Sequence, residues 1–173
     1  MSNNYHFRIA TKDDAPRLQA LIEGAFRFTD ASIEWIGSPD LAKTFSIDMT
    51  VIVDRIASQE NDFLIASETP NGDAIACANV YRKESDYGRI ALLTVDPTIQ
   101  RSGLGKTIMK KAEDYLTEEF AVKRIGLNAL DTRKGLIAWY ERQGYVKTGE
   151  ITKVLIDRFG GKEEISLVEL EKN

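Results

Sequence analysis

The residues best spaced for chemistry form the glycine-containing run Gln100-Arg101-Ser102-Gly103-Leu104-Gly105-Lys106. An apolar strand pattern and a turn at Pro97 precede it, and an amphipathic helix pattern follows it. A glycine loop that enters a helix directs several backbone N–H groups toward one point, and the helix N-terminus adds partial positive charge. The run therefore predicts a binding site for a phosphate or pyrophosphate group.

Three phosphate-binding patterns can be compared with this run. A nucleoside-triphosphate loop requires a glycine where Gln100 stands, although residues 105–107 match its end. A dinucleotide fingerprint requires a third glycine where Ile108 stands. The pattern [Q/R]-x-x-G-x-[G/A] is complete over residues 100–105. An ordinary loop with a glycine-rich helix start would carry the same six residues, so the run alone leaves two interpretations open.

This hexapeptide resembles the acetyl-CoA pyrophosphate loop of the GNAT superfamily of N-acyltransferases. A second segment, residues 136–145, reads Leu-Ile-Ala-Trp-Tyr-Glu-Arg-Gln-Gly-Tyr and is similar to the family's a-x-x-[L/F]-Y-e-[K/R]-x-G-[F/Y] pattern. It lies one helix and one strand after the loop, where the family also places it. Residues 144–150 resemble the G-Y-x-x-T-G-E ending of one branch of the family. Two motifs at this separation are more specific than either alone, and the resemblance spans residues 5–171.

The resemblance implies a role for each motif. Pantetheine would insert between two splayed parallel strands and bond the backbone at residues 93–95, with the Val95 N–H near the thioester carbonyl. The N–H groups from Arg101 to Lys106 would hold the pyrophosphate, with charge added by one of these two side chains. Tyr140 would lie beside the thioester sulfur and donate a proton to the departing thiolate, whereas we expect Trp139 to pack on the sheet. The expected cofactor-binding residues are Leu93, Thr94, Val95, Gln100, Arg101, Ser102, Gly103, Leu104, Gly105, Lys106 and Asn128.

The sequence departs from the family pattern ahead of the tyrosine. Many members have an asparagine seven residues before it, and here that position is Arg133. Asn128 stands earlier, on the preceding strand, and we expect it to serve the cofactor instead. No spacing selects a general base. Four carboxylates flank the expected substrate-side loops, and solvated surface charge explains each of them as well: Glu34, Glu68, Glu84 and Asp86.

Composition limits the classes of protein and of site. The 173 residues are 43% hydrophobic and 29% charged, which predicts one soluble globular domain over residues 1–173. A net charge of −4 argues against a broad nucleic-acid surface. Cys77 and His6 are the only residues of their types, so neither a disulfide nor a cysteine or histidine metal cluster is expected. We expect Cys77 to be a small buried hydrophobe. No membrane span or signal peptide is recognisable, which favours a cytoplasmic location.

The order of secondary-structure patterns is β-α-α-β-β-β-α-β-α-β-β. Helix caps are expected at Thr11, at Ser38 and at Asp131 or Thr132, and Gly144 should end the last helix. Asn71-Gly72 predicts a hairpin turn. The strand–helix–strand passage around the glycine loop makes its two flanking strands parallel neighbours. Expected strands are 7–10, 63–67, 74–81, 87–95, 124–130, 145–156 and 164–170, and expected helices are 12–26, 38–56, 104–120 and 133–143. This is the element order of the GNAT fold, an α/β mixed and strongly twisted sheet with helices on both faces.

The leading functional hypothesis is an acetyl-CoA-dependent N-acetyltransferase, without a metal, that acts on a primary amine of a small molecule or peptide. Transfer of a longer acyl group is an alternative that the loop motif leaves open. A CoA-binding regulatory module without turnover is another, although Tyr140 argues against it. The acceptor is not specified by any motif. Homodimers are common in the family, but no feature of this sequence indicates one.

Overall fold

The computed structural model describes residues 4–27, 46–99, 102–155 and 164–173. Its elements follow the predicted order. They are β1 (His6–Ile9), η1 (Lys12–Asp14), α1 (Ala15–Arg27), α3 (Met49–Ala57), β2 (Asn61–Ser67), β3 (Ala76–Glu84), β4 (Tyr87–Val95), η2 (Pro97–Ile99), α4 (Leu104–Glu119), β5 (Arg124–Leu130), α5 (Lys134–Arg142), β6 (Val146–Leu155) and β7 (Glu164–Lys172).

One seven-stranded mixed sheet has the order β1-β2-β3-β4-β5-β7-β6. Strands β1 to β4 form an antiparallel series, β4 and β5 are parallel, and β5, β7 and β6 are again antiparallel. The predicted turn at Asn71-Gly72 is confirmed, because the Gly72 N–H donates to the Thr69 carbonyl at 3.0 Å. Asn71 has a φ of 60°, which asparagine tolerates better than most residues. The mixed α/β fold predicted from the sequence is therefore confirmed.

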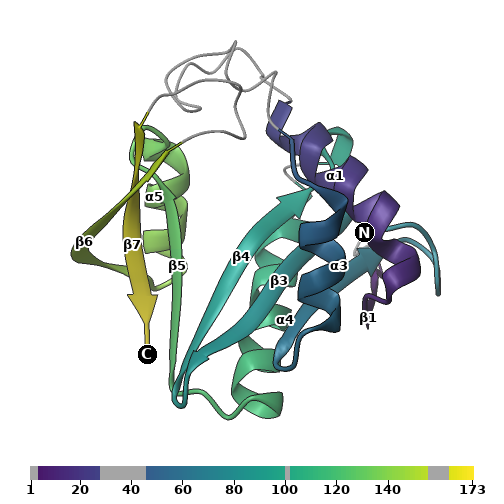
Figure 1. Ribbon diagram of the computed structural model, residues 1–173, viewed down its shortest axis with the longest axis horizontal. Helices are drawn as coiled ribbons and strands as arrows, with labels where there is room; N and C mark the ends of the chain where they lie inside the picture. Colours follow the sequence, from purple (N-terminus) through teal and green to yellow (C-terminus); the bar gives the residue numbers. More distant parts are fainter. Residues whose placement is uncertain (1–3, 28–45, 100–101, 156–163) are drawn as a thin grey trace.

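Helices cover both faces of the sheet, and alternate strand residues pack on each side (Figure 1). Helices α4 and α5 lie on one face, where Ala76, Ala78 and Val80 of β3 join their core. Helices α1 and α3 lie on the other face, and Cys77 of the same strand joins that core. Residues of β4 contribute to both cores, so this central strand is held from both sides.

Two helix boundaries differ from the sequence-based prediction. The helix predicted over 38–56 is not continuous in its described part: residues 46–48 are non-helical, and α3 begins at Met49, where the Asp48 side chain accepts the Thr50 N–H at 3.2 Å. Ile47 before it is non-helical and buried, with its N–H bonded to Glu23 and its carbonyl to Gln19. The predicted cap at Ser38 lies outside the described residues.

The start of α5 was also predicted at the wrong residue. Its N-cap is Arg133 rather than Asp131 or Thr132, and no side chain caps it. The Arg133 N–H donates to the Leu130 carbonyl at 3.0 Å, so the chain turns directly off the end of β5 into the helix. The other end is as predicted, because Gly144 follows the helix with a φ of 100°.

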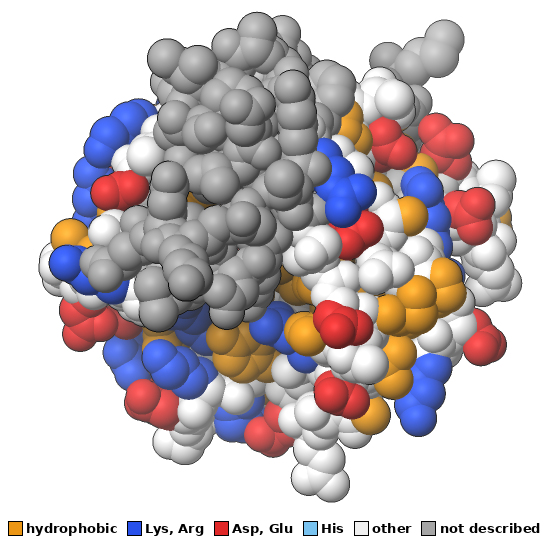
Figure 2. Space-filling model, turned by 45° about the horizontal axis from the view of Figure 1, so that its top comes forward, with side chains coloured by type: hydrophobic (Ala, Val, Ile, Leu, Met, Phe, Trp, Pro, Cys, Tyr) orange, Lys and Arg blue, Asp and Glu red, His pale blue; other side chains and the backbone are white. Residues whose placement is uncertain are grey.

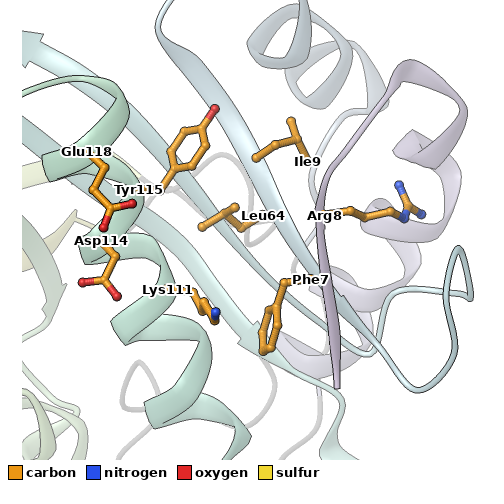
Figure 3. Close-up of a pocket in the computed structure, with 8 residues that line it drawn as sticks. All are labelled: Phe7, Arg8, Ile9, Leu64, Lys111, Asp114, Tyr115 and Glu118. Carbon is orange, nitrogen blue, oxygen red and sulfur yellow. The ribbon is translucent and has the colours of Figure 1, made fainter. Parts of the chain in front are cut away.

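A hollow of about 360 Å³ lies between β1 and the outer side of α4. Figure 3 shows Phe7 and Leu64 at its floor and Lys111 and Tyr115 on its helix side, whereas Arg8 extends to the other side of β1. Strand β1 is the edge of the sheet, three strands from β4. The hollow is therefore separate from the glycine loop that follows β4.

Candidate active site

Strands β4 and β5 form a fork. Their parallel pairing covers only Tyr87–Arg89 against Arg124–Gly126. Strand β4 nevertheless continues to Val95, and β5 continues to Leu130 along its other neighbour, β7. The two strands diverge toward their carboxyl ends (Figure 1). In α/β sheets such a separation at the carboxyl ends of neighbouring strands is where ligands bind.

A β-bulge lies on the β4 side of the fork. The register against β3 passes from Cys77↔Thr94 to Asn79↔Ala91, so β4 contains one extra residue between these pairs. Leu92, inside the bulge, has a φ of 51°. This left-handed conformation costs a residue with a side chain roughly 1–2 kcal/mol. A bulge bends its strand and increases the local twist, which accounts for part of the divergence of β4 from β5.

The carbonyl of Leu92 is held by two side chains. The Thr94 hydroxyl donates to it at 2.9 Å and the Cys77 thiol at 3.6 Å. Both residues are buried, Thr94 at 3% exposure and Cys77 at 0%. Burial raises the pKa of the Cys77 thiol to about 12, outweighing its hydrogen bond with Thr94, so the thiol is protonated at neutral pH. The buried position expected of Cys77 is confirmed. The Thr94 side chain bonds a carbonyl of its own strand.

The glycine loop leads from the carboxyl end of β4 into α4. Gly103 is the N-cap of α4 with a φ of 83°, and Leu104 is buried beneath the first turn. A Cβ at Gly105 would stand 3.7 Å from the Val95 side chain, so the helix start packs against the end of β4. Ser102 and Lys106 are exposed on either side of the cap. The first N–H groups of a helix have no backbone partner within it. In α4 the Leu104 N–H donates to the Ser102 hydroxyl at 3.4 Å, and this first turn of the helix lies beside the fork.

Gln100 and Arg101, predicted to bind the pyrophosphate, lie outside the described residues. For the remaining loop residues, the structure gives the helix start that the prediction requires. Their contact with a cofactor stays a prediction.

Gly103→Ala should lower the free energy of unfolding by about 1 kcal/mol, because alanine is disfavoured at a φ of 83°. No atom lies within 4 Å of the added Cβ, so the cost is conformational and not steric. Gly24→Ala is the matched control, since Gly24 also has open space around its Cβ but lies within α1. That control should raise the stability by about 0.5–1 kcal/mol. Urea unfolding of both variants measures the difference, and equal effects would contradict the explanation.

Tyr140 lies on α5 in the core that also contacts Leu93 and Val95 of β4. Its ring packs edge-to-face against Trp139 and Tyr145, with centroid distances of 5.4 and 6.1 Å. Burial at 6% exposure raises the pKa of the Tyr140 hydroxyl to about 12, although the positive charge of Arg133 opposes this rise. The hydroxyl therefore keeps its proton at neutral pH. Fork, helix start and tyrosine lie on one face of the sheet.

The acetyltransferase (GNAT) family model matches residues 31–145 of this sequence. The chain belongs to the GNAT family of acetyltransferases. Members of this family use acetyl-CoA as co-substrate. The matched range contains both sequence motifs and the strand that carries the bulge.

Solved structures of GNAT proteins have the same fold at low sequence identity. The ribosomal-protein-S18-alanine N-acetyltransferase from Escherichia coli superposes with a TM-score of 0.72 at 17% identity, covering 98% of this chain and 93% of that one. The ribosomal-protein-alanine N-acetyltransferase from Brucella melitensis gives 0.68 at 19%, covering 96% and 98%. The IAA acetyltransferase from Bacillus cereus ATCC 14579 gives 0.62 at 12%, covering 98% and 99%. No curated protein matches the chain in sequence.

A partly buried polar cluster anchors the C-terminal end of α5, just after Tyr140. The Tyr145 hydroxyl donates to the Glu113 carboxylate of α4 at 3.1 Å. Lys172 of β7 donates to the same carboxylate at 3.2 Å and to the Gln143 carbonyl at 2.9 Å. This cluster joins α4, α5 and β7, and it limits the movement of the helix that carries Tyr140.

A buried ion pair closes the base of the fork. Arg89 of β4, in the last pair with β5, donates to Glu169 of β7 at 2.7 Å and to the Tyr87 hydroxyl at 3.0 Å. The Asn128 and Thr152 side chains donate to the other oxygen of Glu169 at 3.3 and 3.1 Å. Asn128, expected to bind the cofactor, therefore directs its amide to this ion pair.

Sequence reasoning missed the Arg89–Glu169 pair. A local signal was available only on β4, where Arg89 is the one charged residue of the strand; β7 also carries Glu164, Glu171 and Lys172, so Glu169 does not stand out there. Gly126 on β5 is required at this point, since a Cβ there would overlap the Tyr87 phenol.

The position of the carboxylates narrows the choice of a general base in this acetyltransferase. Glu84 and Asp86 lie at the β3–β4 turn, at the end of β4 opposite to the opening of the fork, and both approach Arg124 at 3.8 Å. Glu68 is exposed beyond the end of β2. Glu34 lies outside the described residues. Their positions disfavour Glu84 and Asp86 as the base.

Figure 2 shows acidic, basic and apolar side chains interspersed on the described surface around the residues drawn in grey. Within the described residues, no helix is long and apolar enough to cross a membrane, and no group of three or more metal-ligating side chains occurs.

Proposed function

We propose that this GNAT protein transfers the acetyl group of acetyl-CoA to a primary amine by direct attack of the amine on the thioester. One observation carries the proposal. The bulged strand β4 separates from β5 toward the carboxyl ends of the two strands. The N-terminus of α4 and the protonated hydroxyl of Tyr140 lie together on one face of this part of the sheet. Sites for the two ends of the donor and a proton source are thus held by one rigid sheet.

In this proposal the donor lies along the fork. The backbone of Leu93 and Val95 bonds pantetheine on the side of β4 that faces the gap, as a further strand would. The pyrophosphate oxygens accept hydrogen bonds from the backbone N–H groups of residues 101–106 at the start of α4. Gln100 and the side chain of Lys106 bind at the same site. The Gly103 conformation supports this role because it turns the chain into the helix without a side chain in the way.

The reaction needs one bond formed, one broken and one proton delivered to sulfur. The neutral amine nitrogen attacks the carbonyl carbon, the carbon–sulfur bond breaks, and the thiolate takes the proton of the Tyr140 hydroxyl. The nitrogen then gives up one proton, which returns through solvent to the Tyr140 oxygen, so the products are the amide and the free CoA thiol. The pKa of that hydroxyl is about 12, so it holds its proton until a base of similar strength arises beside it. The same apolar surroundings also raise the proton affinity of a thiolate, which favours transfer of the proton to sulfur as the bond breaks.

The acceptor class is the open part of the proposal. The structurally similar proteins include two ribosomal-protein alanine N-acetyltransferases and an IAA acetyltransferase, so their names do not agree on one acceptor.

The proposal is tested with two measurements on the purified chain. Calorimetry with acetyl-CoA should give saturable binding. Release of free CoA thiol should then depend on at least one member of an amine panel that contains polyamines, amino acids, aminoglycosides and peptides with a free N-terminus. Butyryl-CoA in the same assay reports the acyl length. Binding without turnover on any amine would favour a regulatory CoA-binding module, and absence of binding would overturn the assignment of the donor site.

A further inference from the structure

The conformation of the β4 bulge depends on side chains that the mechanism above does not use. At Leu92 the carbonyl receives the Thr94 hydroxyl at 2.9 Å and the Cys77 thiol at 3.6 Å. These two donors come from directly paired residues on β4 and β3. The Leu92 carbonyl is therefore held from within its own strand and from the neighbouring strand at once.

The surroundings of this carbonyl are apolar. Cys77 is part of the core beneath α1, together with Leu18, Leu21 and Ile22, and Leu92 packs against the same core. A buried carbonyl without a partner is strongly disfavoured, and the bulge interrupts the regular ladder that would otherwise supply one. The high pKa of the buried Cys77 thiol keeps this residue a donor at every pH at which the protein would be studied.

We infer that Thr94 and Cys77 are positioning residues of the transferase, which hold Leu92 in its left-handed conformation and so set the direction of the β4 backbone at Leu93 and Val95. The inference rests on the proposed function for its catalytic consequence. Without the hydroxyl of Thr94, Leu92 loses its closer donor, and the extended conformation that leucine prefers becomes competitive. The backbone groups assigned to the thioester would then move relative to Tyr140.

The principal variant is Thr94→Val, which removes the hydroxyl and keeps the branched shape of the buried side chain. We expect kcat to fall about 10- to 100-fold on the amine that the wild type accepts, since a small misplacement of reacting groups has an effect of this size. The Kd of acetyl-CoA should rise by a smaller factor than kcat falls, because the contacts of pantetheine with Leu93 and Val95 shift whereas the pyrophosphate site at α4 is untouched. Thr94→Ser restores the donor and should return kcat to within about threefold of the wild type.

Thr117→Val is the matched control. Its hydroxyl donates to the Glu113 carbonyl at 2.6 Å within α4, so the variant removes the same kind of bond away from the fork. Both valine variants should unfold in a cooperative transition, and Thr117→Val should keep the kcat of the wild type.

A second measurement does not depend on turnover. The backbone ¹³C chemical shifts of Leu92 report whether its φ is positive, and the Thr94→Val variant should move them toward the values of an extended residue. Cys77→Ala should move them in the same direction by a smaller amount, because its hydrogen bond is longer.

The two measurements separate the inference from the proposed function. If Thr94→Val keeps both the kcat and the Leu92 shifts of the wild type, the inference is overturned. If the wild type turns over no amine, the proposed function fails, and the Leu92 shifts still decide whether Thr94 and Cys77 hold the bulge.

Discussion

Replacing Tyr140 with phenylalanine should lower kcat by at least about 100-fold and leave the Kd of acetyl-CoA within about twofold of the wild type. Loss of a general acid costs about 10²–10⁴ in rate. The ring itself remains to pack against Trp139 and Tyr145, so the site keeps its shape. Steady-state CoA release and acetyl-CoA calorimetry give the two numbers. An unchanged kcat would remove Tyr140 from the chemistry.

Tyr115→Phe is the matched control for this variant. Its hydroxyl donates to Asp62 at 2.7 Å on the side of α4 that lines the hollow of Figure 3, away from the fork. Removal of that hydroxyl should lower the free energy of unfolding by about 1 kcal/mol and leave kcat within about twofold. If both variants lost activity equally, the effect would be one of folding and not of proton transfer.

The pH dependence of kcat follows from the same hydroxyl. Burial raises the pKa of Tyr140 to about 12, and the Arg133 charge only partly opposes this. The hydroxyl acts as an acid only in its protonated form, so it should cause no decline of kcat between pH 7 and 10. The same raised pKa stabilises the fold at pH values below the unfolded tyrosine value of about 10, and that contribution is lost as the pH rises through 12.

Glu169→Leu should lower the free energy of unfolding by about 3 kcal/mol, because it leaves the Arg89 guanidinium buried without its carboxylate. The side chains of this pair are only 9% and 12% exposed, and their 2.7 Å bond crosses β5 at the base of the fork. The double variant Arg89→Met/Glu169→Leu removes both charges and should recover most of the loss. Urea denaturation at pH 7 measures both effects.

Asp114→Asn provides the exposed comparison. Asp114 pairs with Lys110 one helical turn away, and the side chains are 42% and 67% exposed. Such a pair contributes little to stability, because water and salt screen its charges. A loss as small as this in Glu169→Leu would contradict a stabilising role for the buried pair.

The acid side of the stability curve should also depend on Glu169. Burial disfavours its charged form, but the hydrogen bond and charge of Arg89, together with the bonds from Asn128 and Thr152, hold the pKa of Glu169 below its ordinary value of 4.5. A depressed folded pKa contributes stability above the unfolded value, and this contribution is lost as the pH falls through the folded value. The wild type should therefore lose stability more steeply than Glu169→Leu below about pH 4.5.

Local patterns were sufficient for the elements and for the family. The apolar run over 87–95 predicted β4, and the 3.6-residue period predicted α4 from residue 104, as observed. The turn at Asn71-Gly72 and the left-handed end of α5 at Gly144 were also predicted correctly. These features depend on backbone preferences of neighbouring residues, which a sequence displays directly.

Boundaries were predicted less well where distant groups compete with local ones. The helix predicted over 38–56 is interrupted at residues 46–48, where Glu23 and Gln19 of α1 bond the backbone of Ile47. Neither contact can be inferred from the cap and apolar pattern that suggested one continuous helix. The start of α5 has a local cause instead, since the Arg133 N–H donates to the Leu130 carbonyl at the end of β5 and no side chain caps the helix.

By itself, then, the sequence determined the order of the elements, the glycine loop at the start of α4 and the family, because spacing along the chain carries that information. Only the tertiary structure decided how the fork is held. Leu92 has a left-handed conformation, and its carbonyl accepts a bond from Cys77 on the neighbouring strand. Arg89 bonds Glu169 across β5. Both bonds join residues that are brought together only by the fold. A hydrogen bond between residues 80 positions apart depends on which strands become neighbours and on which face each side chain lies.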